Sequence, residues 1–363
     1  MKNKIGWTVV WALFTLNVNY GFAAEFQEES EKDFSLRKLG SLNVTNALGD
    51  VSVQGWALDK VRVKIRKTTT APTEQEAQTN FKQVSYRYSV TEKQIEVSSQ
   101  YGESLSIEDR IKLKEKLLTR MDITVFAPSK VPLEIWAIDG KISLKNWNSD
   151  VVIRSKLGSV RAENISSKQV AIHCSACGIE LRNVRSSLRC ISGEGAIKLQ
   201  NIQAAKVFVE TDTGGVTLDS VTGVQTYLSK SGPLVAERLN GEIEFRTQSG
   251  SVNMNGINGF LGGFSDTGDI TIRISKWTPK DRTVIESTKG KIQLSLPYAF
   301  SGDVDFCSLH GKTDVEIAVE RDDLLSGEGP QPSTRLVGRV RNGGELLKVF
   351  SEYGDIRVFK GKF

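Results

Sequence analysis

Apolar and polar residues alternate along most of the chain in a pattern that returns about every 18 or 19 residues. Each copy holds a Ser or Thr, two variable positions, a Gly, and then aliphatic residues at alternate positions, as in TQSGSVNMNGI at 247–257. This alternation predicts strands with one buried face. The glycines share one phase, with Cys177 filling the slot after Gly158: Gly140, Gly158, Gly195, Gly214, Gly232, Gly250, Gly268, Gly290 and Gly311.

A fixed period of this length is typical of a solenoid, because one copy is too small to fold alone and buries its apolar face against its neighbours. An apolar residue also stands seven positions after each slot, and it often follows an Asn that suits a tight corner: Asn146, Asn164, Asn183 and Asn201. We therefore predict an all-β fold, a single-domain β-solenoid that is like a parallel β-helix, with coils of about 18–19 residues.

A hydroxyl side chain stands three residues before most of these slots. There it can accept hydrogen bonds from backbone N–H groups of the turn and bond to the hydroxyls of neighbouring coils, while Gly supplies a positive φ. A nucleophile needs one base beside one Ser, so we interpret these residues as a structural turn ladder. Its members are Ser155, Ser192, Thr211, Ser229, Thr247, Ser265, Ser287, Ser308 and, in the last copy, Ser351.

The first residues have the features of a secretory signal peptide. Lys2 and Lys4 precede an apolar run over 5–16, and small residues at Gly21 and Ala23 suit a signal peptidase. The alternative is a retained anchor, but the run is short for a membrane span. We expect residues 1–23 to be a cleaved signal peptide, 24–38 an N-terminal extension, and 39–363 the solenoid domain. The mature protein would then be exported, either periplasmic or at the cell surface or secreted, with no integral membrane segment.

Residues 71–130 interrupt the repeat. Thr73 and Glu76 have capping-box spacing before a short amphipathic helix, VSYRYSV and KQIEVSS alternate like a hairpin, a charged helix follows at 105–120, and MDITVFAP is typical of a returning strand. We predict that 71–130 forms a small α+β side module that covers the N-terminal end of the solenoid. Residues 320–334 carry acid, Gly and Pro without period and predict a flexible loop.

The order of these segments resembles a known family. GDVSVQG, KVRVKIRK, EQEAQ and ITVFAPSKVPLEIWAIDGKISLKN, followed by stacked copies of Gly-x-Val/Ile-x-Val/Leu, are similar to the bacterial putative-adhesin family of exported β-strand-repeat proteins. The resemblance covers roughly residues 39–319 and 346–360. It implies the strand-repeat fold and a binding or adhesion role.

Four cysteines in an exported chain raise the question of disulfides. Cys174 occupies a hydroxyl slot and Cys177 a glycine slot, so the pair lies in a chemically variant turn. Two states are open, a small disulfide that closes this turn and two free thiols; our hypothesis is the disulfide. A metal site of four cysteines is not expected, because Cys307 lies about six coils from Cys190.

Charge and carboxylate placement bear on function. The formal net charge is +5, with both signs spread along the chain, which argues against nucleic acid as a partner. Asp212 and Asp266 share a turn position but stand three coils apart, too far to act together. We predict no catalytic site, no cofactor and no metal.

The function that follows is a non-catalytic binding, adhesion or scaffold element of the cell envelope or surface. Its partner would be an unidentified protein or glycan that contacts an outward strand face. The alternatives are a carbohydrate-active enzyme, a polysaccharide lyase or hydrolase on a β-helix, and an envelope stress or signalling component.

Overall fold

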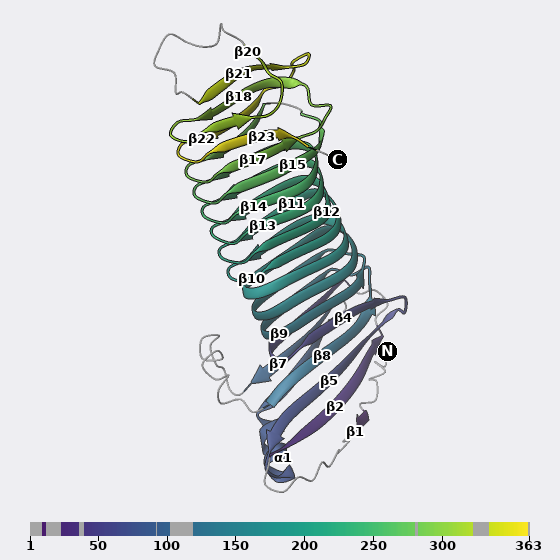
Figure 1. Ribbon diagram of the computed structural model, residues 1–363. Helices are drawn as coiled ribbons and strands as arrows, with labels where there is room; N and C mark the ends of the chain where they lie inside the picture. Colours follow the sequence, from purple (N-terminus) through teal and green to yellow (C-terminus); the bar gives the residue numbers. More distant parts are fainter. Residues whose placement is uncertain are drawn as a thin grey trace. The chain divides into compact units, whose positions relative to one another are not determined.

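The computed structural model describes residues 9–11, 23–35, 40–91, 93–101, 119–279, 282–321 and 334–361. The fold is all-β and solenoid-like, as predicted: strands follow the coils, and most neighbouring strands pair in parallel (Figure 1). Two compact units divide the chain, unit 1 over Met1–Glu180 and unit 2 over Leu181–Phe363.

Unit 1 is built on strands that the sequence repeat only partly covers. Its elements, in chain order, are β1 (Val9–Trp11), β2 (Ala24–Ser35), β3 (Ser41–Leu48), β4 (Val51–Trp56), β5 (Lys60–Ala71), α1 (Glu74–Lys82), β6 (Val84–Val90), β7 (Gln94–Tyr101), β8 (Thr119–Pro128), β9 (Leu133–Trp147) and the first part of β10 (Val151–Ser192).

Parallel and antiparallel pairs meet in unit 1. β9 pairs in parallel with β3, β4 and β10, as solenoid coils do. β5 pairs antiparallel with both β2 and β8, and β8 pairs in parallel with β4. The stretch expected to be an N-terminal extension is therefore largely β2, which pairs with β5 from Ala24 to Ser35.

The predicted helix and hairpin of the side module are confirmed. Thr73 caps α1, and its hydroxyl accepts the N–H of Glu76 at 3.3 Å. Ala77 and Phe81 bury the inner face of the helix, and β6 and β7 form the antiparallel hairpin. The charged helix expected at 105–120 lies outside the described residues over 105–118, and its last two positions belong to β8. Residues 322–333 of the expected loop, and 1–8 and 12–22 of the signal peptide, also lie outside them.

Unit 2 holds the regular coils. Its elements are the rest of β10, β11 (Ile197–Thr211), β12 (Val216–Ser229), β13 (Leu234–Thr247), β14 (Val252–Ser265), β15 (Ile270–Trp277), β16 (Thr283–Ser287), β17 (Ile292–Leu296), β18 (Gly302–Ser308), β19 (Thr313–Val315), β20 (Glu320–Arg321), β21 (Arg335–Val340), β22 (Leu347–Ser351) and β23 (Ile356–Lys360).

Each regular coil turns its corner through one left-handed residue. The Asn residues predicted for this corner have φ near +55°, which Asn tolerates because its short polar side chain bonds locally. The next coils place Ser220, Arg238 and Gly256 at the same corner with positive φ. The coil geometry therefore imposes a left-handed conformation at the corner. Asn or Gly, either of which adopts it readily, occupies most of these corners.

Glycine fills the turn slot of unit 2 because the coils stack too closely for a side chain. A Cβ on Gly214 would lie 2.1 Å from the carbonyl oxygen of Gly195 in the preceding coil. The expectation of a positive φ holds at Gly140 and Gly158 in unit 1 but is wrong at Gly214, whose φ is outside the left-handed region. The same close approach to a neighbouring turn's carbonyl recurs at Gly232, Gly250, Gly268, Gly290, Gly311 and Gly354.

The last coils of unit 2 do not stack in chain order. β22 and β23 pair in parallel with β16 and β17 on one side and with β18 and β19 on the other. The spacing of the repeat placed Gly290 and Gly311 in consecutive coils, which is wrong, because the turn of Gly354 lies between them. The C-terminal segment is thus inserted into the stack.

This stacking makes a prediction about Gly250. Gly250→Ala would place a methyl group 2.1 Å from the carbonyl oxygen of Gly232, so we expect a loss of about 2–4 kcal/mol in stability. Gly215→Ala is the matched control, because its Cβ would meet Pro233 at 3.5 Å, an ordinary contact. Thermal unfolding of both variants measures the difference; equal midpoints would contradict the steric account.

Candidate functional site

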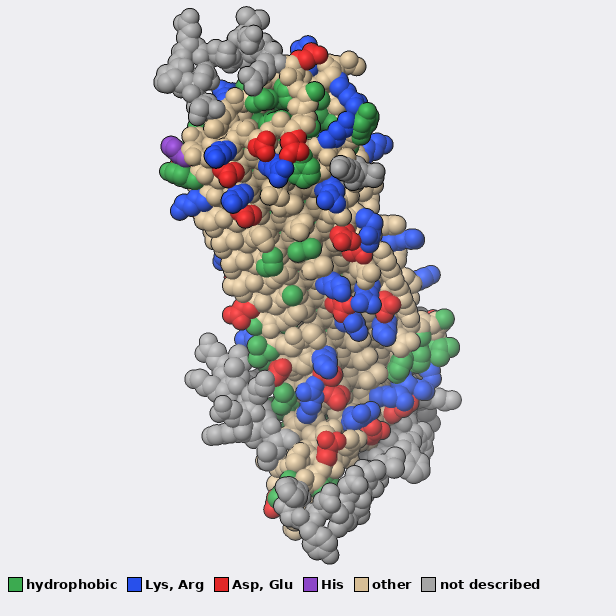
Figure 2. Space-filling view, viewed as in Figure 1, with side chains coloured by type: hydrophobic (Ala, Val, Ile, Leu, Met, Phe, Trp, Pro, Cys, Tyr) green, Lys and Arg blue, Asp and Glu red, His purple; other side chains and the backbone are tan. Residues whose placement is uncertain are grey.

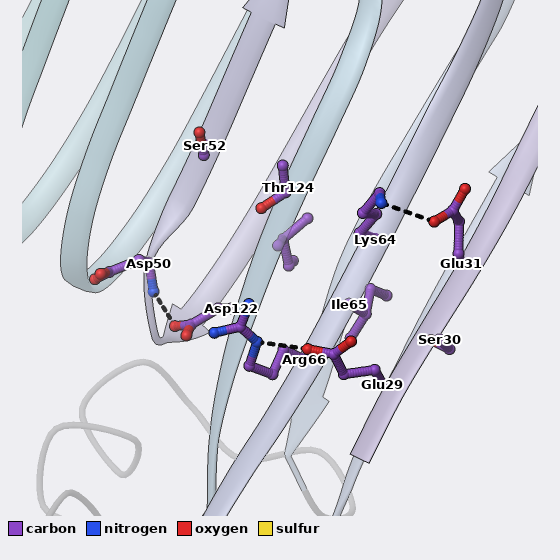
Figure 3. A pocket seen from close by; sticks show the side chains of 11 residues that line it. Glu29, Ser30, Glu31, Asp50, Ser52, Lys64, Ile65, Arg66, Asp122 and Thr124 are labelled. Carbon is purple, nitrogen blue, oxygen red and sulfur yellow. Dashed lines mark hydrogen bonds and ion pairs between the residues drawn. The ribbon is translucent and has the colours of Figure 1, made fainter. Parts of the chain in front are cut away.

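A hollow of about 390 Å³ opens on the outward face of unit 1, over β2, β5, β8 and β4 (Figure 3). Its lining mixes acids, bases and hydroxyls, with two isoleucines that are buried below: Glu29, Ser30, Glu31, Asp50, Ser52, Lys64, Ile65, Arg66, Asp122, Ile123 and Thr124. Period-two alternation explains the arrangement, since every second residue of each strand points outward.

Strand register arranges the outward side chains in rows that cross the four strands. One row contains Glu29, Arg66 and Asp122, because Arg66 is the register partner of Glu29 on β2 and of Asp122 on β8. Arg66 Nε donates to Glu29 Oε1 at 2.9 Å (Figure 3). Opposite charges therefore face one another directly across the strands, which is the favourable arrangement for cross-strand pairs.

The next row forms the floor of the hollow. It runs from Glu31 through Lys64 and Thr124 to Ser52, and the Lys64 ammonium lies 2.9 Å from Glu31 Oε2. Thr124 and Ser52 have short side chains; Thr124 stands beside Lys64, and Ser52 follows on the next strand (Figure 3). The change from long to short side chains within one row leaves the hollow open above them.

Asp50 and Asp122 close one end of the hollow, and both carboxylates are engaged. Asp122 Oδ1 accepts the backbone N–H of Asp50 at 2.8 Å and Arg120 Nε at 3.2 Å. Asp50 Oδ1 accepts the N–H of Lys141 at 2.8 Å and pairs with the Arg120 guanidinium. Burial lowers the pKa of Arg120, but the two carboxylates outweigh it and the pKa is raised.

The rows supply a fixed grid of hydrogen-bond donors and acceptors of both signs. Each ion pair is half exposed and contributes little to stability by itself. Such a surface suits a ligand rich in hydroxyl or amide groups more than one of a single charge sign. Figure 2 shows Lys and Arg interspersed with Asp and Glu on the face in view. Over the ranges that the structure describes, no three residues of the metal-binding types His, Cys, Asp and Glu gather as a ligand set.

The predicted ladder residues lie in the turns and bond to the turn backbone. The Thr247 hydroxyl accepts the N–H of Gly250 at 3.1 Å, and the Ser265 hydroxyl donates to the carbonyl of Gly268 at 2.7 Å. Equivalent bonds to turn backbone occur at Ser155, Ser192, Thr211, Ser229, Ser308 and Ser351. The Ser287 hydroxyl is buried without a partner in the structure. None of these residues lines the hollow.

Sequence reasoning missed the residues of the hollow. KVRVKIRK places Lys60, Arg62, Lys64 and Arg66 at alternate positions, and the segment at 25–33 is rich in acid. Together these signals could have indicated a charged outward face with complementary strands. The acidic segment contains too few apolar residues to predict a strand by alternation, so the pairing of β2 with β5 was not expected.

Cys174 and Cys177 lie together in β10 of unit 1 as a disulfide, with Cα atoms 5.5 Å apart. Both are buried. Cys190 and Cys307 are free and buried, and burial raises the pKa of both thiols.

The disulfide predicts the outcome of thiol counting. Alkylation of the denatured chain without a reductant should modify two cysteines, Cys190 and Cys307, and prior reduction should raise the number to four. Intact mass measures both counts. Four modified cysteines without reduction would contradict the disulfide.

Asp33, in the row beside the hollow, predicts acid sensitivity. Hydrogen bonds from Arg62 at 2.8 and 3.0 Å, and then from Lys60, lower its pKa to about 2 despite the opposing effect of burial. The pair therefore stabilises the fold above the ordinary aspartate pKa, and this contribution is lost as the pH falls through about 2.

Asp33→Asn should lower the free energy of unfolding at neutral pH by less than about 1 kcal/mol, because the pair is exposed. It should also reduce the loss of stability between pH 4 and pH 2, which is measured by thermal unfolding against pH. Identical pH profiles for the variant and the original chain would contradict this assignment.

No helix in the described part of the chain has the length and apolarity of a membrane span, and no curated protein matches the sequence significantly. One similar solved structure is described as a "putative cell adhesion protein" from Clostridium sporogenes, with 11% identity over 92% of this chain and 100% of that chain and a TM-score of 0.21. Another is a "putative adhesin" from Bacteroides fragilis, with 12% identity, 65% and 96% coverage and a TM-score of 0.34.

A family model matches residues 28–359, from within β2 to within the final strand, β23. This range contains both the charged hollow of unit 1 and the regular coils of unit 2. The chain therefore belongs to the family described as Toastrack DUF4097.

Proposed function

We propose that this chain is an exported, non-catalytic binding element of the bacterial cell envelope or surface, which holds a protein or glycan partner on its outward strand faces. One observation carries the proposal: the hollow of unit 1 is a preformed grid, in which Glu29, Arg66, Glu31 and Lys64 hold one another in fixed rows. Preformed sites cost less entropy on binding than mobile ones. The predicted signal peptide supports export.

The state of the carboxylates favours binding over hydrolysis. A glycoside hydrolase uses one carboxyl group as a proton donor and a second as nucleophile or base. In the hollow, the Asp50 and Asp122 carboxylates both accept backbone N–H groups and pair with Arg120. The Oδ1 atom of each carboxylate is thus engaged in contacts between β4, β8 and β9, and this supports the binding role over the carbohydrate-active alternative.

The proposal predicts that filling the hollow weakens envelope binding. Thr124→Tyr should decrease the affinity of the full chain for isolated envelope fragments by about 10-fold, or about 1.4 kcal/mol, because the ring occupies the space above the floor row. Gln169→Tyr, an exposed position elsewhere in unit 1, is the control and should bind as the original chain.

Cosedimentation with envelope fragments measures both affinities, and thermal unfolding confirms that the variants fold. A chain that does not bind the fragments, or that releases soluble sugars from them, would overturn the proposed function. Equal loss in both variants would show that the hollow is not the binding site.

A further inference from the structure

β2 is a long strand with one open side, at the margin of the unit 1 sheet that carries the hollow. Its inner edge pairs with β5 over all twelve of its residues, from Ala24 to Ser35. Among the strands that the structure describes, its outer edge pairs only with β1, over Glu29 to Glu31 (Figure 1). The N–H and C=O groups of a strand edge that lacks a neighbour are a template for pairing with another chain.

The pairing with β1 shows that this edge accepts an added strand. β1 lies antiparallel to β2, and Val10 is in register with Ser30. β1 belongs to the predicted signal peptide, residues 1–23. Cleavage of that peptide would remove β1, so the outer edge of β2 in the exported protein would lose the strand that covers it here.

The rows of charge that cross the sheet end on acids at this edge. Glu29 ends the row of Asp122 and Arg66, in which the sign of the charge alternates from strand to strand. Glu31 ends the next row, where it pairs with Lys64 at 2.9 Å. Each of these two carboxylates therefore has a base on the β5 side, and on its other side it would face a residue of the added strand.

Cross-strand pairing selects the side chains of that strand. Opposite charges that stand directly across two strands attract one another, and like charges repel. A second copy of β2 would bring acids opposite acids, because acids fill most positions on the outward face of the strand. These positions are Glu25, Glu29, Glu31 and Asp33. Lys or Arg opposite Glu29 and Glu31 would instead continue the alternation of signs, so the edge fits a basic strand better than a second copy.

The residue between the two acids has an unmet hydrogen bond. Ser30 is buried, and its hydroxyl has no partner in the described part of the chain. A buried polar group without a partner is costly. A Thr or Ser directly opposite can bond to it, as hydroxyl pairs do across strands. The segment that covers the edge here has Val10 at this register position, and valine has no hydroxyl.

We propose that the outer edge of β2 binds an extended segment of a partner protein as an added antiparallel strand, with basic side chains opposite Glu29 and Glu31 and a hydroxyl opposite Ser30. The proposal rests on the proposed binding function, including removal of the signal peptide, and names its partner class. Glu29 and Glu31 also line the hollow, so the added side chains extend the same rows. In strand addition, main-chain hydrogen bonds supply affinity and alternate side chains supply specificity.

The test uses the full chain, expressed with its own signal peptide and isolated after export, and its intact mass should show that residues 1–23 are absent. The probe is a peptide of alternating Thr and Lys, about nine residues long, which is within the usual length of a strand. Titration calorimetry should show binding that weakens with salt, because the acids are exposed. A peptide of alternating Thr and Glu should bind at least about 10-fold more weakly.

Backbone methylation separates strand addition from simple charge attraction. Successive residues of a strand direct their N–H groups to opposite sides, so methylating alternate amides removes hydrogen bonds on one side only. Because the Lys side chains must face the acids, one set of methyl groups should weaken binding at least about 10-fold, and the other set should have little effect. Hydrogen exchange should slow in β2 when the peptide binds and stay unchanged in β9.

A double variant tests the two acids. Glu29→Gln with Glu31→Gln should weaken binding of the Thr–Lys peptide by about 10-fold. The unfolding midpoint should stay within a few degrees, because exposed pairs contribute little to stability. Glu134→Gln is the matched control, since Glu134 is a half-exposed carboxylate that pairs with Arg154 elsewhere in unit 1. It should bind the peptide as the original chain does.

Retention of residues 9–11 in the exported chain, absence of peptide binding, equal binding of the Lys and Glu peptides, equal effects of the two methylation patterns, or unchanged exchange in β2 would each overturn the strand-addition site. A dimer with β2 protected in the absence of peptide would also overturn it, in favour of a second copy. Envelope binding that survives any of these results would leave the proposed function standing, so the two failures are distinguishable.

Discussion

The structure depends on how closely one coil lies on the next. Parallel strands in register stand about 4.8 Å apart, and at the turn this spacing brings the carbonyl of one coil to about 2 Å from where the Cβ of the next would be. Glycine occupies that position in the turns of unit 2, and Cys177 takes it in one coil of unit 1. Once the turn is fixed, the register of both strands of the coil follows, and each inward residue stacks on its counterpart.

The hydroxyl ladder compensates for a cost of this close stacking. A turn that packs this tightly would bury N–H and carbonyl groups, and a buried unpaired polar group is costly. The Thr247 hydroxyl bonds to both the N–H and the carbonyl of Gly250. The Ser308 hydroxyl bonds to its own turn and also to the carbonyl of Gly354 in the neighbouring one. Ser or Thr therefore recurs with Gly, because the hydroxyl pairs with backbone groups that the closely packed glycine turn would otherwise bury unpaired.

Much of the fold could be predicted from the sequence because this constraint acts within each copy. The glycine phase, the inward positions and the Asn corners are local, and the helix cap at Thr73 is local too. The position of the last coil could not be predicted, because insertion of Gly354 between Gly290 and Gly311 changes no residue pattern within a copy. The corner at Arg238 could not be predicted from its residue type, because tertiary packing imposes a positive φ on a residue that does not favour it.

The candidate sites were the least predictable part. The hollow of unit 1 depends on which strand of a charged sequence pairs with which, and Glu29 meets Arg66 only through the long-range pairing of β2 with β5. The opening over β12, β13, β14 and β16 depends on Gly262, which looks like the other glycines in the sequence. Only the space around its Cβ separates Gly262, where a side chain fits, from Gly263, where none does.

Parallel stacking in register is the central claim, and continuous-wave EPR of paired spin labels tests it most directly. In a chain with Cys190 and Cys307 replaced by Ala, labels at Thr217 and Val235 occupy register partners of adjacent coils, about 4.8 Å apart. Labels at Thr217 and Thr226 occupy the two strands of one coil, which would be neighbours in an antiparallel hairpin. The account predicts strong dipolar broadening for the first pair and none for the second; the reverse would contradict it.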